Sequence, residues 1–136
     1  MLETKLECQL EINTEFFHSF NGETNRETKK EVAIVNVSEY GKNLIIIVEG
    51  SEPIITVSTG NTFGQVKSYY NQSTENVWQL SNELNHRGGG EGSNDLRIDR
   101  NTGLITFLRL SSSKTSTVKV NGSGYCSKVD TTKKKF

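Results

Sequence analysis

Proline and long apolar stretches are scarce in this chain. Pro53 is the single proline, so no proline-rich linker divides the 136 residues. No run approaches the roughly 18 apolar residues that a transmembrane helix requires, and the longest one, at 43–50, has the length of a strand. Hydrophobic residues make up only 32% of the chain, which still allows a thin core. These features predict one β-rich domain over residues 1–136, without a membrane span and with a flexible basic tail at 130–136.

Net charge is also absent, because 16 basic residues balance 16 acidic ones. A nucleic-acid partner is therefore not expected from the total charge. The distribution is uneven: residues 1–85 carry 6 basic and 12 acidic side chains, whereas residues 86–136 carry 10 basic and 4 acidic ones. Such a split is typical of a charged binding surface, but it also arises when the two halves pair as neighbouring strands. We favour the second interpretation.

Signatures of catalysis and of metal binding are missing as well. The two histidines, His18 and His86, lie outside any zinc-ligand spacing. The glycine-rich segment Gly88–Gly92 lacks the lysine of a phosphate-binding loop. It resembles one turn of a calcium-binding β-roll, with Asn94 at the position of the usual aspartate, but such turns bind calcium only when several are stacked. The sequence thus predicts no metal, no cofactor and no enzymatic activity.

Strict alternation of apolar and polar residues is the strongest pattern that is present. Over residues 5–16, one face of the predicted strand is apolar and the other is charged or amidic. This period of two is typical of a strand with one buried face. The residues on the apolar face are Leu6, Cys8, Leu10, Ile12, Thr14 and Phe16.

Further strands follow at short intervals, separated by turn residues. We expect them near 31–40, 43–50, 53–60, 65–71, 77–84, 95–100, 104–110, 117–122 and 124–130, with polar loops at 21–30 and 86–95. Asn21-Gly22 indicates a hairpin turn, and Gly103 is expected at positive φ. The predicted fold is all-β, a single antiparallel β-sandwich or small β-barrel of about 8–10 strands. One short helix around 77–85 is the alternative for that segment, because Val77, Leu80 and Leu84 also fit helical spacing.

The two cysteines, Cys8 and Cys126, lie near opposite ends of the chain. A disulfide closing so long a loop would contribute about 4–5 kcal/mol in the chain-entropy account, which matters when apolar residues are few. We therefore favour a bridge, and with it an oxidising compartment. The alternative is two free thiols.

Three short motifs resemble a loose group of small exported bacterial proteins of unknown function. These are the first-strand cysteine, an Arg-x-Thr-Gly hairpin late in the chain, and a Gly-x-Cys strand before a basic end that closes with Phe. The matching positions are Cys8, Arg100, Thr102, Gly103, Gly124, Cys126, Lys135 and Phe136. The resemblance covers both ends of the chain but little of residues 20–90. It implies a signal peptide that is removed, a periplasmic or secreted location and a Cys8–Cys126 bridge, but no activity.

Together these patterns predict an exported domain that acts by binding a protein partner through loops or a sheet edge, for example as an inhibitor of an envelope enzyme or as an adaptor. The alternative is a lipocalin-like carrier of a small apolar ligand, which would need an internal cavity of several hundred Å³ near Trp78, Phe107 and the strand at 43–50. As contact residues we predict four charged side chains in and after the glycine-rich loop: Arg87, Glu91, Asp95 and Arg97.

Overall fold

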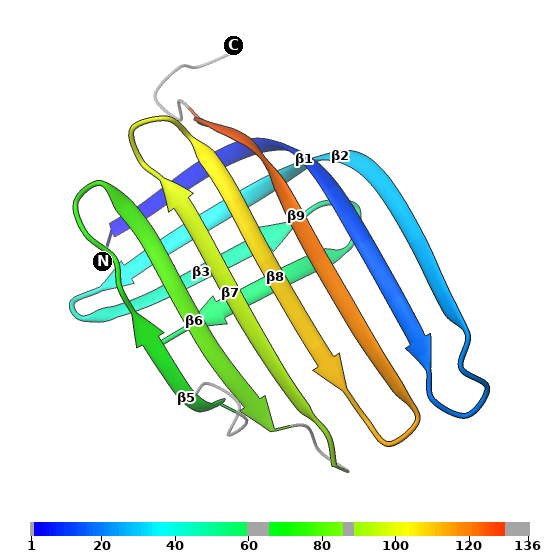
Figure 1. The fold of residues 1–136 in the computed structure, drawn as a ribbon. Helices are drawn as coiled ribbons and strands as arrows, with labels where there is room; N and C mark the ends of the chain where they lie inside the picture. The colour runs from blue at the N-terminus through cyan, green and yellow to red at the C-terminus, as the bar shows by residue number, and fades with distance from the viewer. Residues whose placement is uncertain (1, 60–65, 86–88, 130–136) are drawn as a thin grey trace.

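Nine antiparallel strands form one curled sheet in the computed structural model, which describes residues 2–59, 66–85 and 89–129 (Figure 1). Nine strands confirm the predicted all-β class. The alternative of a helix at 77–85 is wrong, because this segment pairs with the next strand along its whole length. The strands are β1 (Leu2–His18), β2 (Thr24–Tyr40), β3 (Asn43–Glu49), β4 (Pro53–Ser58), β5 (Val66–Asn71), β6 (Val77–Asn85), β7 (Glu91–Asp99), β8 (Leu104–Ser112) and β9 (Ser116–Lys128).

The strand order β4-β3-β2-β1-β9-β8-β7-β6-β5 joins two meanders through the first and last strands. Each neighbouring pair is antiparallel, including β1 with β9. Because the strand direction reverses at each step of this order, β4 and β5 run in the same direction, although they follow each other in the sequence. They therefore cannot form a hairpin, and the two ends of the sheet remain unpaired with each other.

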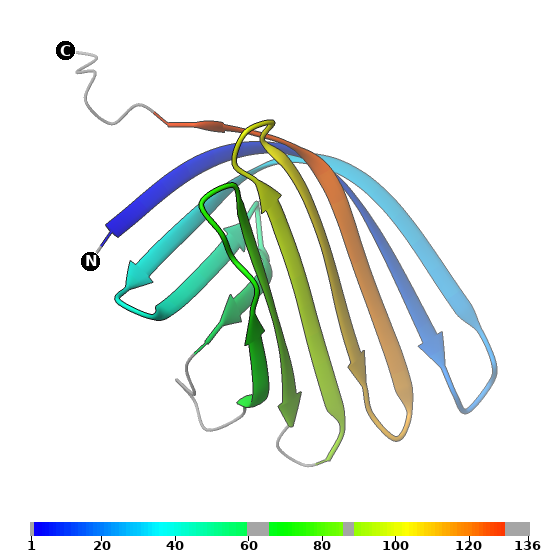
Figure 2. The same cartoon turned by 60° about the vertical axis from the view of Figure 1, so that its left-hand side comes forward.

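The sheet curls so that β3 and β4 lie across the inner face of β6 and β7 (Figure 2). The core fills the space between these two layers, and its residues come from the alternating inward positions of seven strands. Leu80, Ile98 and Ile46 are among its most deeply buried members. Trp78 is also in the core, at 4% exposure, and the guanidinium of Arg100 lies 4.2 Å from the centre of its ring.

Two segments that the sequence analysis assigned to loops belong largely to strands. Residues 24–30 form the first half of β2, and residues 91–94 begin β7. The hairpin turn at Asn21-Gly22 is confirmed, with Gly22 at a φ of 71°. The strand before it does not bulge at Phe16, and its pairing with β2 continues without a register shift to Phe17. The predicted tail at 130–136 lies outside the described residues.

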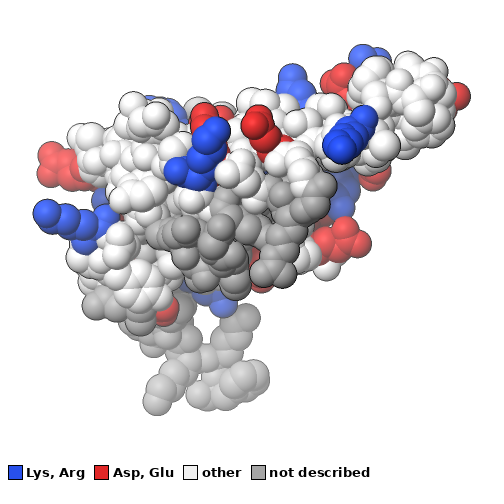
Figure 3. Space-filling view, turned by 90° about the horizontal axis from the view of Figure 1, so that it is seen from below, with Lys and Arg blue, Asp and Glu red and all other residues white. Residues whose placement is uncertain are grey.

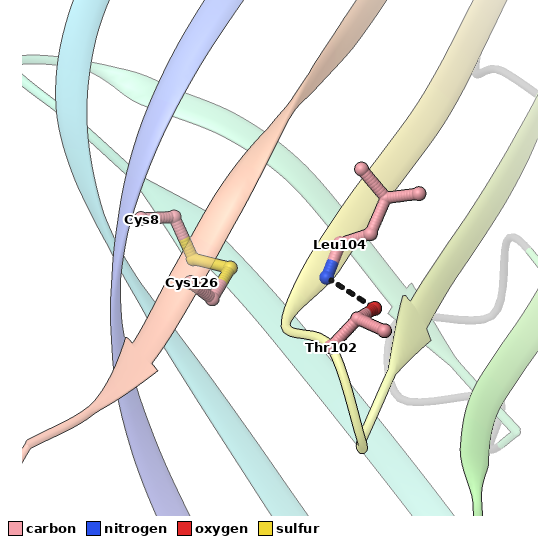
Figure 4. Close-up of a disulfide and its surroundings, with 4 residues drawn as sticks. All are labelled: Cys8, Thr102, Leu104 and Cys126. Atoms are coloured by element: carbon pink, nitrogen blue, oxygen red, sulfur yellow. Dashed lines mark hydrogen bonds between the residues drawn. A yellow bond between two sulfur atoms is a disulfide. The ribbon is translucent and has the colours of Figure 1, made fainter.

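A disulfide joins Cys8 and Cys126, as predicted, on directly opposite positions of β1 and β9 (Figure 4). The β7–β8 turn lies against this strand pair, because the backbone N–H of Cys126 donates to the carbonyl of Gly103 at 2.8 Å. Gly103 has a φ of 80°, and a Cβ there would overlap the carbonyl oxygen of Cys126. The Arg-x-Thr-Gly and Gly-x-Cys segments are therefore in contact, although twenty residues separate them in the sequence.

Candidate functional site

The predicted contact residues do not form one site. Glu91, Asp95 and Arg97 all lie within β7 on the convex face of the sheet rather than in a loop. Asp95 and Arg97 border one shallow cleft of about 240 Å³, and Glu91 borders a separate one of about 380 Å³. Arg87 lies outside the described residues. The loop on which this prediction depended is therefore shorter than expected.

The segment that resembles a calcium-binding turn is mostly strand. Asn94, the position of the usual aspartate, is buried on the concave face and donates from its side-chain amide to Asn82 Oδ1 at 3.0 Å. Asp95 points to the opposite face, as neighbouring strand residues must. Within the described ranges, no group of three His, Cys, Asp or Glu side chains could hold a metal ion.

The clefts found in the described residues are open surface depressions rather than an interior cavity. Their volumes range from about 240 to 430 Å³. One of them, about 310 Å³, lies beside Trp78, Arg100 and Cys126. The position proposed for a carrier pocket, near Trp78 and Phe107, is occupied by side chains that are at most 4% exposed.

Polar side chains of β6 and β8 close the outer edge of β4, and of these Asn82 is buried and Arg109 is exposed. Arg109 of β8 donates from Nη1 to the carbonyl of Ile54 at 3.1 Å, and Asn82 of β6 donates to the carbonyl of Ser58 at 3.4 Å. Asn94 in turn holds the amide of Asn82. These groups supply hydrogen bonds that a neighbouring strand would otherwise supply. We therefore assign Asn82 and Asn94 a structural role.

The outer edge of β2 is open over ten residues. β3 pairs with β2 only between Ile34 and Tyr40, because its hairpin with β4 turns away after Glu49. Among the residues that the structure describes, no strand pairs with Thr24–Ala33 on that side, while β1 pairs with it on the other. Figures 1 and 2 show this half of the β1–β2 hairpin extending beyond β3 and β4. We call Thr24–Ala33 the free edge of β2.

Hydrogen bonds at the hairpin turn show which backbone groups of the free edge point outward. His18 donates its N–H to the carbonyl of Glu23 at 2.9 Å. The backbone N–H and C=O groups of Glu23, and of every second residue after it, therefore point toward β1. On the far side of β1, the N–H of Val129 donates to the carbonyl of Lys5, which fits the same alternation. The residues whose N–H and C=O groups point away from β1 are therefore Thr24, Arg26, Thr28, Lys30 and Val32.

The free edge ends at a carboxylate that is fitted against the β3–β4 hairpin. Glu31, whose side chain is 15% exposed, accepts a bond from Lys29 Nζ at 2.9 Å. A Cβ on Gly50 would overlap the Glu31 carboxylate, so only glycine leaves room for it there. The hydrogen bond from Lys29 to Glu31, with further attraction from that carboxylate, raises the pKa of Lys29 above its usual 10.5. This contact lies where the pairing of β3 with β2 ends.

Aromatic side chains gather at the other end of the free edge, near the β1–β2 turn. The rings of Phe16 and His18 lie 4.4 Å apart between centres, and those of His18 and Phe20 lie 5.6 Å apart. Phe20 is 77% exposed, and Phe17 on the opposite face is 40% exposed. The end of the hairpin is thus apolar on both faces, although the free edge itself is charged.

Residues 24–30 were not predicted as a strand edge, because they are polar at every position and show no apolar alternation. A second signal was present in the sequence. A strand that runs to Phe16 and is followed by a tight Asn21-Gly22 turn needs a partner directly after that turn. The register confirms this, since Phe16 lies opposite Asn25.

Opposite charges from the two halves of the chain were expected to pair across neighbouring strands. Among the described residues, Glu15 and Lys119 are the one such pair that lies directly opposite. Figure 3 shows basic and acidic side chains interspersed on the face seen from below.

No helix in the described part of the chain is long and apolar enough to cross a membrane. Comparison with protein-family models, with curated proteins and with solved structures finds no match.

Proposed function

We propose that this protein is a binding domain that takes up an extended segment of a protein partner along the free edge of β2. The observation that carries the proposal is the run of outward N–H and C=O groups at alternate positions from Thr24 to Val32. An added strand would satisfy these groups and continue the sheet. At about 3.3 Å per residue, the ten-residue edge is roughly 33 Å long, enough for a full strand.

The contrast with β4 supports a binding role for this edge. Natural proteins commonly protect an open edge with bulges, prolines or covering side chains. β4 begins at Pro53 and receives side-chain donors on its outer carbonyls. The free edge of β2 keeps a regular register and is exposed from Thr24 to Lys30. Charged side chains are the only protective device of this kind that it carries.

The Cys8–Cys126 disulfide supports a location outside the reducing cytosol. We propose a periplasmic or secreted protein, in which the partner is an envelope or extracellular protein and the domain serves as an inhibitor or adaptor. The carrier alternative is less well supported, because the described clefts lie at the surface and Phe107 itself is buried in the core.

A photo-reactive side chain at position 28 tests the proposal in the organism that makes the protein. Position 95 on the convex face of β7 is the matched control, since it is exposed but lies inside the sheet. We expect a defined adduct from position 28, mapping to an extended segment of one protein. Lys30→Pro should abolish it, because proline removes one outward N–H and leaves the bonds to β1 in place. An adduct that survives Lys30→Pro, or that forms only at position 95, would overturn the proposal.

A further inference from the structure

We infer that the free edge of β2 disfavours pairing with a second copy of itself and binds a strand of another protein that carries a complementary charge pattern. This inference rests on the proposed function and names the class of its partner. It concerns the alternating charges at Arg26, Glu27, Lys29, Lys30 and Glu31, which have side chains on both faces of the hairpin. The occupant we propose is an extended segment of another protein with acidic side chains on the convex face and basic ones on the concave face.

Sheet geometry limits the ways in which two copies could pair edge to edge. Antiparallel strands that continue one sheet place directly opposite side chains on the same face. A symmetric pair of free edges must therefore be centred on one residue, which lies opposite its own copy. Pairings that engage at least five residues on each strand can be centred only on residues 26 to 31 of the ten-residue edge.

Each of these six registers sets like charges directly opposite each other. Centres at Arg26, Glu27, Lys29, Lys30 and Glu31 place a charged residue against itself. The remaining centre, Thr28, places Arg26 against Lys30 of the second copy, twice by symmetry. Like charges directly opposite are destabilising in a sheet. Opposite charges also meet in two of the registers: Glu27 lies opposite Lys29 about Thr28, and Lys29 lies opposite Glu31 about Lys30. Lys29 and Glu31 already bond each other within one copy, and no register avoids a like-charge pair. The edge is therefore less favourable to its own sequence than to a strand of complementary charge.

The same side chains are arranged to recognise a different strand. Arg26 and Lys30 lie on the convex face, where their neighbours on β1 are Glu15 and Glu11. Arg26 makes an exposed ion pair with Glu15 at 3.7 Å, which contributes little and leaves the guanidinium accessible. Glu27 and Glu31 lie on the concave face. An antiparallel segment fits best with acidic residues opposite Arg26 and Lys30 and with basic residues opposite the two glutamates.

Two nonapeptides of identical composition test this inference on the intact protein. Thr-Val-Lys-Glu-Thr-Val-Lys-Glu-Thr, aligned antiparallel to 25–33, places opposite charges at all four positions. Thr-Val-Glu-Lys-Thr-Val-Glu-Lys-Thr places like charges there. We expect the first peptide to bind at least about tenfold more tightly by amide NMR titration, with shifts confined to the free edge. Equal binding of both peptides would overturn the charge selectivity and leave strand addition standing. Binding of neither would overturn the proposed function as well.

Arg26→Glu gives an independent test that needs no peptide. In the register centred on Thr28, this change converts both repulsive pairs into attractive ones and adds them to the Glu27–Lys29 pairs. We expect Arg26→Glu to self-associate about tenfold more strongly than the wild type, measured by sedimentation equilibrium. Arg97→Glu makes the same change of charge inside the sheet and should not self-associate. A wild-type protein that already dimerises through the free edge, or equal behaviour of the two variants, would overturn the inference.

Discussion

The outer edges of β4 and β2 differ in how their unpaired backbone groups are satisfied. Both strands leave backbone groups without a neighbouring strand, yet β4 is covered and β2 is not. β4 is largely buried, and side chains of β6 and β8 donate to its outward carbonyls. The free edge of β2 is exposed and charged, and nothing in the described residues covers it.

The position of each edge in the fold accounts for the difference. β4 lies against β6 and β7, where an unsatisfied carbonyl would be buried and costly. The free edge of β2 lies beyond the reach of β3, so water can satisfy its groups and no covering is needed. An edge that is solvated in the free protein is also one that a partner strand can occupy. The fold thus closes the outer edge of β4 and leaves the free edge of β2 available.

The largest expected effect comes from opening the closed edge. Asn82→Leu removes the donor to the Ser58 carbonyl and the acceptor of the Asn94 amide without changing the side-chain shape greatly. We expect a loss of about 2 kcal/mol in the free energy of unfolding, measured with urea. Asn25→Ala, an amide deletion on the free edge, should change it by less than about 0.5 kcal/mol. Similar losses in both variants would contradict the structural contrast between the edges.

A smaller effect is expected where the free edge ends, at Glu31. Gly50→Ala forces the Glu31 carboxylate out of its place and separates it from Lys29, which we expect to cost about 1 kcal/mol. In a Glu31→Ala background the same change should cost much less, because the overlapping atoms are gone. A double-mutant cycle by urea unfolding measures this coupling. Additive losses would show that Glu31 and Gly50 do not contact each other.

The smallest effect on stability is expected in a turn of the sheet, at Asp99 between β7 and β8. The backbone N–H groups of Thr102 and Asn101 donate to the Asp99 carboxylate and lower its pKa below the usual 3.8. Since the folded-state pKa is depressed, this contribution to stability is present above pH 3.8 and is lost as pH falls through the folded-state value. We expect the free energy of unfolding of Asp99→Asn, measured with urea, to fall less steeply with acid below pH 3.8 than that of the wild type. Amide hydrogen exchange along the free edge of β2 should stay unchanged. An identical acid dependence in both proteins would contradict this.

The sequence was sufficient to predict the buried strands and the disulfide. Alternation at Leu6, Cys8 and Leu10 identified both the first strand and the face that carries the bridge. It could not identify strands whose pattern comes from pairing rather than burial. Residues 24–30 extend because β1 pairs with them, and residues 91–94 extend because β6 and β8 flank them. The closed edge was also hidden, since Asn82 and Arg109 meet β4 only after the sheet has curled.

Residue-resolved amide exchange tests the central claim most directly. If the free edge of β2 is open, the N–H groups of Thr24, Arg26, Thr28, Lys30 and Val32 exchange rapidly. Those of the intervening residues, which bond to β1, are protected. The account therefore predicts fast and slow exchange at alternate residues along the edge, beside uniformly slow exchange in β6 and β7. Uniform protection along 24–33 would show that the edge is covered in the free protein, and uniformly fast exchange would show that this half of β2 is not paired with β1.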